Sequence, residues 1–282
     1  MFVHSMTYEE IYREIRSDFG DVMEHFKQVV KPAIGKLARK TADSRYPVRH
    51  VYGWEHPKSH NAYFFLAIVK KHSLWDKPEA TIFCEVERKE GKEIIVPAIG
   101  GNIYTLRDGL IISVFQPHFL QRYAERFIDD EEFKKDRIMY FLIRNAYAIS
   151  LGEKLASDKE LQKIDPELSN ESLLNIDGLC LGKRSRENHN IIIYKTFIPI
   201  NRLHPQQYVV VMREYLQLYY MAACRDYPQC KAVIHQICED GVKKMQEILT
   251  GENSSLKPEE RLKAYTDEYE RTCNKLCEYI IL

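Results

Sequence analysis

The stretch from residue 46 to residue 116 constrains the fold most, because its apolar residues recur with the short period that is typical of β-strands. Two turn sequences, Glu90-Gly91 and Asp108-Gly109, separate successive strands in the manner of tight hairpins. Short connections of this kind join antiparallel neighbours. The stretch is therefore predicted to form an antiparallel meander, with strands at residues 48–54, 61–70, 80–88, 92–99, 103–107 and 110–116.

Two of these segments predict where the sheet is covered. Segment 80–88 alternates apolar and polar residues, so one of its faces is expected to meet solvent. Segment 61–70 is apolar on both faces, which favours a central position in the sheet.

Helical spacing is predicted at both ends of the chain and in its middle. Residues 7–41 favour two helices, with Thr7 as the N-cap of the first and a break at Gly20-Asp21. One helix is expected to begin at Pro117 and another to cover residues 130–151, before strands at 175–182 and 190–198. Residues 201–282 repeat apolar residues at intervals of three and four over three helices, which predicts a hairpin or small bundle.

The predicted fold class is α+β, an antiparallel sheet with helices packed on it and a C-terminal helical bundle. We expect N-terminal helices over residues 1–45, an α+β core over 46–200 and the helical bundle over 201–282. A chain of 282 residues is long enough to bury a large core in one or two domains.

The composition excludes a strong electrostatic field from net charge. Lys plus Arg and Asp plus Glu both number 41, so an anionic partner must be held by a local patch. No run of about 20 apolar residues is present, and the start lacks a basic region followed by an apolar one, so neither a membrane partner nor a secretory signal is expected. Seven cysteines within apolar stretches favour free thiols and a cytoplasmic location.

The predicted helix after Pro117 carries the side chains that are best suited to catalysis. His118, Arg122 and Arg126 share one side of it, because residues four apart lie about 40° apart on a helix. A histidine that titrates near neutral pH can move protons, and guanidinium groups stabilise charge on phosphate oxygens. The set would suit cleavage of RNA without a metal, since the 2′-hydroxyl is an internal nucleophile. Alternatively, the two arginines pair with nearby carboxylates and His118 caps the helix.

A basic turn between the strands at 175–182 and 190–198 is the second candidate. If this hairpin lies beside strand 110–116, its turn approaches the His118 helix and adds phosphate-binding groups. Alternation along a strand allows only one of Lys195 and Thr196 to face His118. The predicted phosphate-binding residues are Lys183, Arg184, Arg186, Lys195 and Thr196.

The pattern His-x3-Arg-x3-Arg on a helix that follows a strand, with further strands behind it, resembles the small RelE- and BrnT-like ribonuclease toxins. The matching residues lie between about 110 and 200 and include His118, Arg122, Arg126 and the segments 178–182 and 191–197. The resemblance implies a compact helix-on-sheet core, cleavage of RNA with no cofactor, and a protein antitoxin partner. The chain departs from the family in its length, its neutral net charge and its added meander and helices.

A third candidate is a metal site with Cys224, Cys230, His235 and Cys238 as ligands. Their spacing lacks the Cys-x2–4-Cys knuckle of structural zinc sites, so small core residues are the simpler interpretation. His50, His56 and His60 are interpreted as loop or rim residues. The chain contains no phosphate-binding P-loop, dinucleotide-binding glycine motif, zinc-protease motif or serine-hydrolase elbow.

Two functions therefore stay open at the level of sequence. The first is a nucleic-acid-directed protein, either a metal-independent endoribonuclease or a non-catalytic relative that binds RNA or phosphate. The second is a protein that performs no chemistry and uses its tyrosine-rich C-terminal helices to bind a partner or to self-associate.

Overall fold

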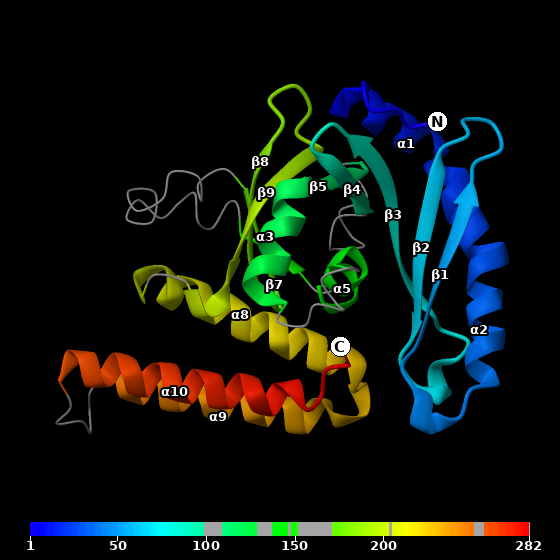
Figure 1. Ribbon diagram of the computed structural model, residues 1–282. Helices are drawn as coiled ribbons and strands as arrows, with labels where there is room; N and C mark the ends of the chain where they lie inside the picture. Colours follow the sequence, from blue (N-terminus) through cyan, green and yellow to red (C-terminus); the bar gives the residue numbers. More distant parts are fainter. Residues whose placement is uncertain are drawn as a thin grey trace.

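Nine strands form one mixed sheet in the order β1-β2-β3-β4-β5-β9-β8-β7-β6 (Figure 1). The computed structural model describes residues 1–98, 109–128, 137–145, 148–151, 171–202, 205–250 and 257–281. The strands are β1 Val48–Glu55, β2 Ala62–Val69, β3 Glu79–Arg88, β4 Gly91–Ala98, β5 Ile111–Phe115, β6 Ala148–Ser150, β7 Glu171–Asn175, β8 Gly178–Arg184 and β9 Ile191–Pro199.

The predicted meander is confirmed for β1 to β5, which pair antiparallel in chain order. The prediction of an antiparallel sheet is confirmed in part: the sheet is mostly antiparallel, but β5 pairs parallel with β9. Helices and further strands separate β5 from β9, which is the long connection that a parallel pair requires. The predicted strand at 103–107 lies outside the described residues.

The N-terminal helices cover one face of the sheet. Helix α1 (Tyr8–His25) begins at a capping box in which Thr7 and Glu10 exchange hydrogen bonds, as the sequence predicted for Thr7. The predicted break at Gly20 is wrong, because α1 continues through it and a π-helical turn (Phe26–Val30) leads into α2 (Lys31–Arg39). Exposed glycine is tolerated in a helix at a cost of about 1 kcal/mol.

Helices α3 (Pro117–Phe127) and α5 (Arg137–Arg144) cover the opposite face. Neighbouring residues of one strand divide between the two layers, as for Phe65 on the α1 side and Leu66 on the α3 side. The prediction of helix up to residue 151 is wrong, because β6 occupies 148–150. The sequence interpretation also missed β7, which pairs with β6 and β8.

Three helices follow the sheet, as predicted: α8 (Pro205–Asp226), α9 (Lys231–Thr250) and α10 (Pro258–Cys277). They pack below the sheet in Figure 1 and share a core with β7 and β8. Four of their tyrosines pack into that core and are each at most 9% exposed: Tyr215, Tyr219, Tyr265 and Tyr269.

The end of α8 also reaches the other end of the sheet. Asp226 is fully buried and binds Lys70, which directly follows β2, while the backbone N–H of Ile281 donates to its second carboxylate oxygen at 2.9 Å. Beside it, Arg225 pairs with Glu79 of β3 at 2.7 Å. Core clusters therefore join the sheet to helices at both ends of the chain, and the division into residues 1–45, 46–200 and 201–282 stays a prediction.

No helix in the described ranges is long and apolar enough to cross a membrane.

Candidate functional site

The structure places the predicted His118 face on the outside of α3. His118 is exposed, and its Nε2 accepts a hydrogen bond from Nε of Arg122 at 3.3 Å. Arg122 also pairs with Glu125 at 3.2 Å. Arg126 donates to the backbone carbonyl of Phe197 at 2.5 Å, which fixes α3 on β9. His118 and Arg122 thus lie side by side, whereas Arg126 holds α3 on the sheet.

The basic hairpin has partners of its own. Arg184 pairs with the buried carboxylate of Glu171 at 2.8 Å and donates to the carbonyl of His189 at 2.8 Å. Asn188 at its tip donates to Glu9 of α1 at 2.9 Å. Arg184 therefore stabilises the pairing of β7 with β8. Lys183 is half-buried, while Arg186 and Lys195 are exposed.

A β-bulge changes the expected orientation of Lys195 and Thr196. Leu181 pairs with Thr196 and Gly182 with Tyr194, so Lys195 is an extra residue in β9. Gly182 fits this bulge because a Cβ there would lie 2.5 Å from the carbonyl oxygen of Ile193. The simple alternation assumed for these two residues does not hold across the bulge.

The hairpin and the start of α3 do share one cavity, of about 580 Å³. Gln116 lines it from the α3 side and Ser185 from the hairpin. Its charged groups are four carboxylates and one guanidinium, which disfavours a phosphodiester there. They are Glu9, Glu90, Glu93, Glu187 and Arg88.

The buried groups of this cavity satisfy one another. Glu93 is 5% exposed and accepts from Nε of Arg88 at 2.8 Å and from the hydroxyl of Tyr8 at 2.7 Å. Gln116 donates to Tyr8 at 3.1 Å. Burial, with the Glu93 carboxylate adding to it, raises the pKa of Tyr8 to about 12, so the phenol stays a donor at neutral pH.

The predicted metal ligands do not assemble. In the described part of the chain, no group of three or more His, Cys, Asp or Glu side chains is placed to hold a metal ion. His235 instead pairs with Glu239 at 3.1 Å. Cys224, Cys230 and Cys238 are half-buried free thiols packed against the core of the helical bundle.

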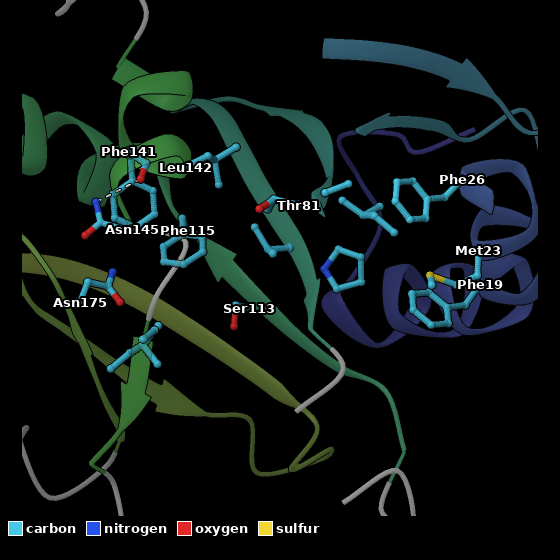
Figure 2. A pocket seen from close by; sticks show the side chains of 16 residues that line it. Phe19, Met23, Phe26, Thr81, Ser113, Phe115, Phe141, Leu142, Asn145 and Asn175 are labelled. Carbon is cyan, nitrogen blue, oxygen red and sulfur yellow. Dashed lines mark hydrogen bonds between the residues drawn. The ribbon is translucent and has the colours of Figure 1, made fainter. Parts of the chain in front are cut away.

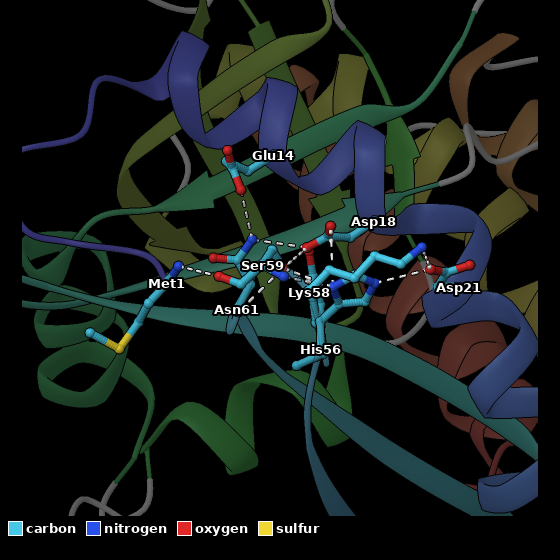
Figure 3. Close-up of polar contacts among 9 residues, drawn as sticks. Met1, Glu14, Asp18, Asp21, His56, Lys58, Ser59 and Asn61 are labelled. Carbon is cyan, nitrogen blue, oxygen red and sulfur yellow. Dashed lines mark hydrogen bonds and ion pairs between the residues drawn. The ribbon is translucent and has the colours of Figure 1, made fainter.

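A second histidine cluster, which the sequence interpretation assigned to a loop, joins α1 to the β1–β2 hairpin (Figure 3). His56 lies 3.0 Å from Oγ of Ser59 and 3.1 Å from Asp21, an outline that resembles a hydrolase triad. However, Nδ1 of His56 accepts the backbone N–H of Ser59 at 3.1 Å, and the Ser59 hydroxyl donates to Asp18 at 2.6 Å. His56 is therefore not free to take the Ser59 proton, and the cluster is structural.

Asp18 is the centre of that cluster. It is buried and accepts hydrogen bonds from Ser59, Asn61 and Tyr63 at 2.6–2.8 Å. Burial alone would raise the pKa of this carboxyl, but these bonds outweigh burial and lower the pKa below its usual value.

The feature that sequence reasoning missed is a cleft where the sheet splits. The first half of β3, Glu79–Phe83, pairs with β2, and pairing with β4 begins only at Cys84. Strand β4 continues to pair with β5 through Pro97 and Ala98. Proline has no backbone N–H, so Pro97 cannot donate to a strand on the β3 side. The two strands therefore diverge, and a cavity of about 490 Å³ lies between them.

Apolar side chains form the two walls of this cleft (Figure 2). One wall comes from α1, the π-helical turn and β3, and it contains Phe19, Met23, Phe26, Ala80, Thr81 and Ile82. The opposite wall comes from β4, β5, α5, β6 and β7, and it contains Val96, Pro97, Ser113, Phe115, Phe141, Leu142, Asn145, Ala148, Leu173 and Asn175. An apolar cavity with a few polar groups is the usual form of a binding site.

Asn175 is the polar residue of the cleft whose side chain has an unpaired hydrogen-bond acceptor. It is 1% exposed, and its Nδ2 lies 3.2 Å from the sulfur of Cys180. Its Oδ1 is buried and has no hydrogen-bond partner in the described structure. Native proteins rarely leave such an acceptor unpaired, so this oxygen is available to accept a hydrogen bond from a molecule in the cavity.

A saturated network holds the same wall in place. Asp177, in the β7–β8 turn, accepts from Tyr123 at 2.6 Å, from Arg144 at 2.8 Å and from Asn145 at 3.0 Å. These bonds tie α3 and α5 to the sheet beside Asn175. Asn145 is therefore already paired. The unpaired Oδ1 of Asn175 lies next to this network, which holds the surrounding backbone in place.

Comparison with models of protein families, with curated proteins and with solved structures found no match to this chain.

Proposed function

We propose that the chain is a non-enzymatic binding protein whose cleft takes an extended peptide segment of another protein. The peptide adds as a strand to the open edge of β3. The observation that carries the proposal is that, among the described residues, Glu79–Phe83 pair with β2 alone and lie beside an apolar cavity. The proposal keeps the protein-partner expectation but moves it from the C-terminal helices to the sheet.

The backbone of β3 supplies the first part of the recognition. In an antiparallel pair, alternate residues direct both N–H and C=O toward the partner strand, and the residues between them direct both groups away. In Glu79–Phe83 the groups directed away from β2 therefore point toward the cleft. An unpaired edge of this kind is a template for another strand. Five residues of strand span about 17 Å, which is enough for several main-chain hydrogen bonds.

The walls supply the second part. Alternate side chains of an added strand point to opposite faces, toward Phe19 and Phe26 on one side and toward Phe141 and Leu142 on the other. These walls favour apolar residues in the peptide. The orphan Oδ1 of Asn175 favours one hydrogen-bond donor among them.

A peptide selected on the full-length protein from a random phage-displayed library tests the proposal. The selected peptide, labelled with fluorescein, is titrated with wild type, with Thr81→Trp, and with the control Ser73→Trp on an exposed turn. Because an indole at Thr81 fills the cleft, Thr81→Trp is expected to weaken binding at least about tenfold while Ser73→Trp leaves it unchanged.

A second measurement distinguishes pairing of the peptide backbone with β3 from binding through apolar side chains alone. Methylation of alternate backbone nitrogens of the peptide removes main-chain donors without changing its side chains, and methylation of the donors that face β3 is expected to abolish binding. Equal binding by wild type and Thr81→Trp, or indifference to every N-methylation, contradicts the proposal.

Cleavage of RNA by the α3 face is a second candidate, and the contact between the exposed His118 and the half-buried Arg122 favours it. In this candidate His118 moves the proton and Arg122 stabilises charge on the phosphate. An RNA-cleavage assay compares wild type with His118→Ala, Arg122→Ala and the control Gln121→Ala on the same exposed helix surface. Activity that is equal in all four proteins, or absent from wild type, removes this candidate.

A further inference from the structure

We infer that the outer surface of α2 and the indole of Trp75 together bind single-stranded RNA through its phosphates and one stacked base. This surface lies on the α1–α2 side of the sheet and shares no residue with the cleft or with the His118 face. The inference therefore does not depend on the proposed function.

The charge of this surface is one-sided. Residues 25–42 contain no Asp or Glu and five cations, all exposed: Lys27, Lys31, Lys36, Arg39 and Lys40. None of the five forms an ion pair with a carboxylate in the part of the chain that the structure describes. Since the whole chain is neutral, this is the local patch that an anionic partner requires.

Trp75 is built into the same surface. Gly35 of α2 lies against its backbone, where a Cβ would come within 2.9 Å of the Trp75 carbonyl oxygen. Trp75 is 38% exposed, with the guanidinium of Arg39 5.3 Å from the ring centroid. An exposed indole held next to an arginine is the arrangement on which nucleic-acid bases stack.

The cations flank the indole at regular intervals. Lys31, Gly35 and Arg39 are four residues apart, so they form one row along the helix with steps of about 6 Å. Trp75 covers the middle position, which leaves a cation on either side of it. The nearest carboxylates in sequence are Glu24 and Asp43, which flank the basic segment, and the exposed Asp76. Asp43 lies 3.9 Å from His72. Between Glu24 and Asp43 the helical segment carries cations and no carboxylate.

A single strand fits this surface better than the alternatives. Val29 and Leu37 are also exposed here, as at surfaces that bind anionic lipid, but stacking on an indole needs an unpaired base. A duplex hides its bases and would gain only the phosphate contacts.

Fluorescence anisotropy of a fluorescein-labelled 12-nucleotide oligouridine tests the inference on the full-length protein. The charge reversal Lys31→Glu with Arg39→Glu is expected to lower affinity at least about tenfold. The matched control, Lys231→Glu with Lys243→Glu on the exposed side of α9, is expected to leave it unchanged. Raising salt from about 50 to 200 mM is expected to weaken wild-type binding roughly twentyfold for three phosphate contacts.

Stacking has its own readout. In a Trp54→Phe protein Trp75 is the remaining tryptophan, so its fluorescence reports on the site alone, and RNA is expected to quench it. Trp75→Leu keeps an apolar side chain against Gly35 and is expected to lower affinity about fivefold or more. Loss of binding in the α9 control, equal affinity for a 12-base-pair duplex, or binding to phosphatidylserine vesicles without binding to RNA overturns the inference.

Discussion

The two halves of β3 show how one strand serves two purposes. Its second half, Cys84–Arg88, pairs with β4 and is packed closely, with Cys84 and Val86 at most 1% exposed. Its last side chain, Arg88, donates to the carbonyls of His4 and Met6 and so holds the N-terminal segment at this end of the sheet. The first half pairs with β2, and Ala80, Thr81 and Ile82 are half-buried beside the cleft. The difference teaches that the second half is held by its pairing with β4, whereas the first half has the backbone groups that the proposed peptide would pair with.

Among the tests of this difference between the two halves of β3, Arg88→Ala is expected to have the largest effect on stability. It leaves the buried Glu93 carboxylate with Tyr8 as a neutral donor, so the free energy of unfolding is expected to fall by about 3 kcal/mol. Lys92→Ala, which breaks the more exposed pair with Glu85, is the control and is expected to cost less than about 1 kcal/mol. Urea unfolding at neutral pH measures both, and equal losses would show that the second half of β3 has no special role.

The next effect is a pH dependence at the same place. The folded state raises the pKa of Tyr8 from 10.0 to about 12, mainly through burial. A raised pKa means that this stability is complete below pH 10 and is lost as pH rises through about 12, because the unfolded chain releases the proton first. Tyr8→Phe is expected to flatten that part of the curve of unfolding free energy against pH, measured by urea unfolding from pH 8 to 11.5.

Tyr279→Phe, near the end of α10, is the control for the titration of other phenols. If Tyr8→Phe and Tyr279→Phe change the alkaline curve equally, the buried Tyr8–Glu93 contact does not cause the effect.

The smallest change in stability is expected in the cleft. Asn175→Leu removes an orphan acceptor and one weak contact with sulfur, so the free energy of unfolding is expected to change by less than about 1 kcal/mol. Affinity for the selected peptide is expected to fall about fivefold, the value of one hydrogen bond. Urea unfolding and peptide anisotropy measure the two effects, and a large loss of stability with no loss of affinity would make Asn175 a structural residue.

The local patterns predicted the meander, α3 and the three C-terminal helices, because each depends on residue spacing within one segment. The parallel pairing of β5 with β9 was not predictable in this way, since it joins segments about 80 residues apart. The short strands β6 and β7 were missed because a three-residue and a five-residue strand give little periodic signal.

The candidate site was harder to predict than the fold. Spacing placed His118 and Arg122 together on α3, and the structure has them in contact. Spacing gave no information on Glu171, which pairs with Arg184, or on Phe197, whose carbonyl binds Arg126. The cleft depends on where two strands diverge, and Pro97 is the one sequence signal that points to it.

The parallel seam between β5 and β9 has a consequence for how the chain folds. Strands β1 to β5 can join through neighbouring hairpins, whereas β9 pairs with β5 across a connection that contains α3, α5 and β6 to β8. Closing so long a loop costs entropy before any pairing is gained, so this seam is expected to form late and to limit the folding rate. Each half of the sheet then has time to collapse around its own helices before the two halves are joined.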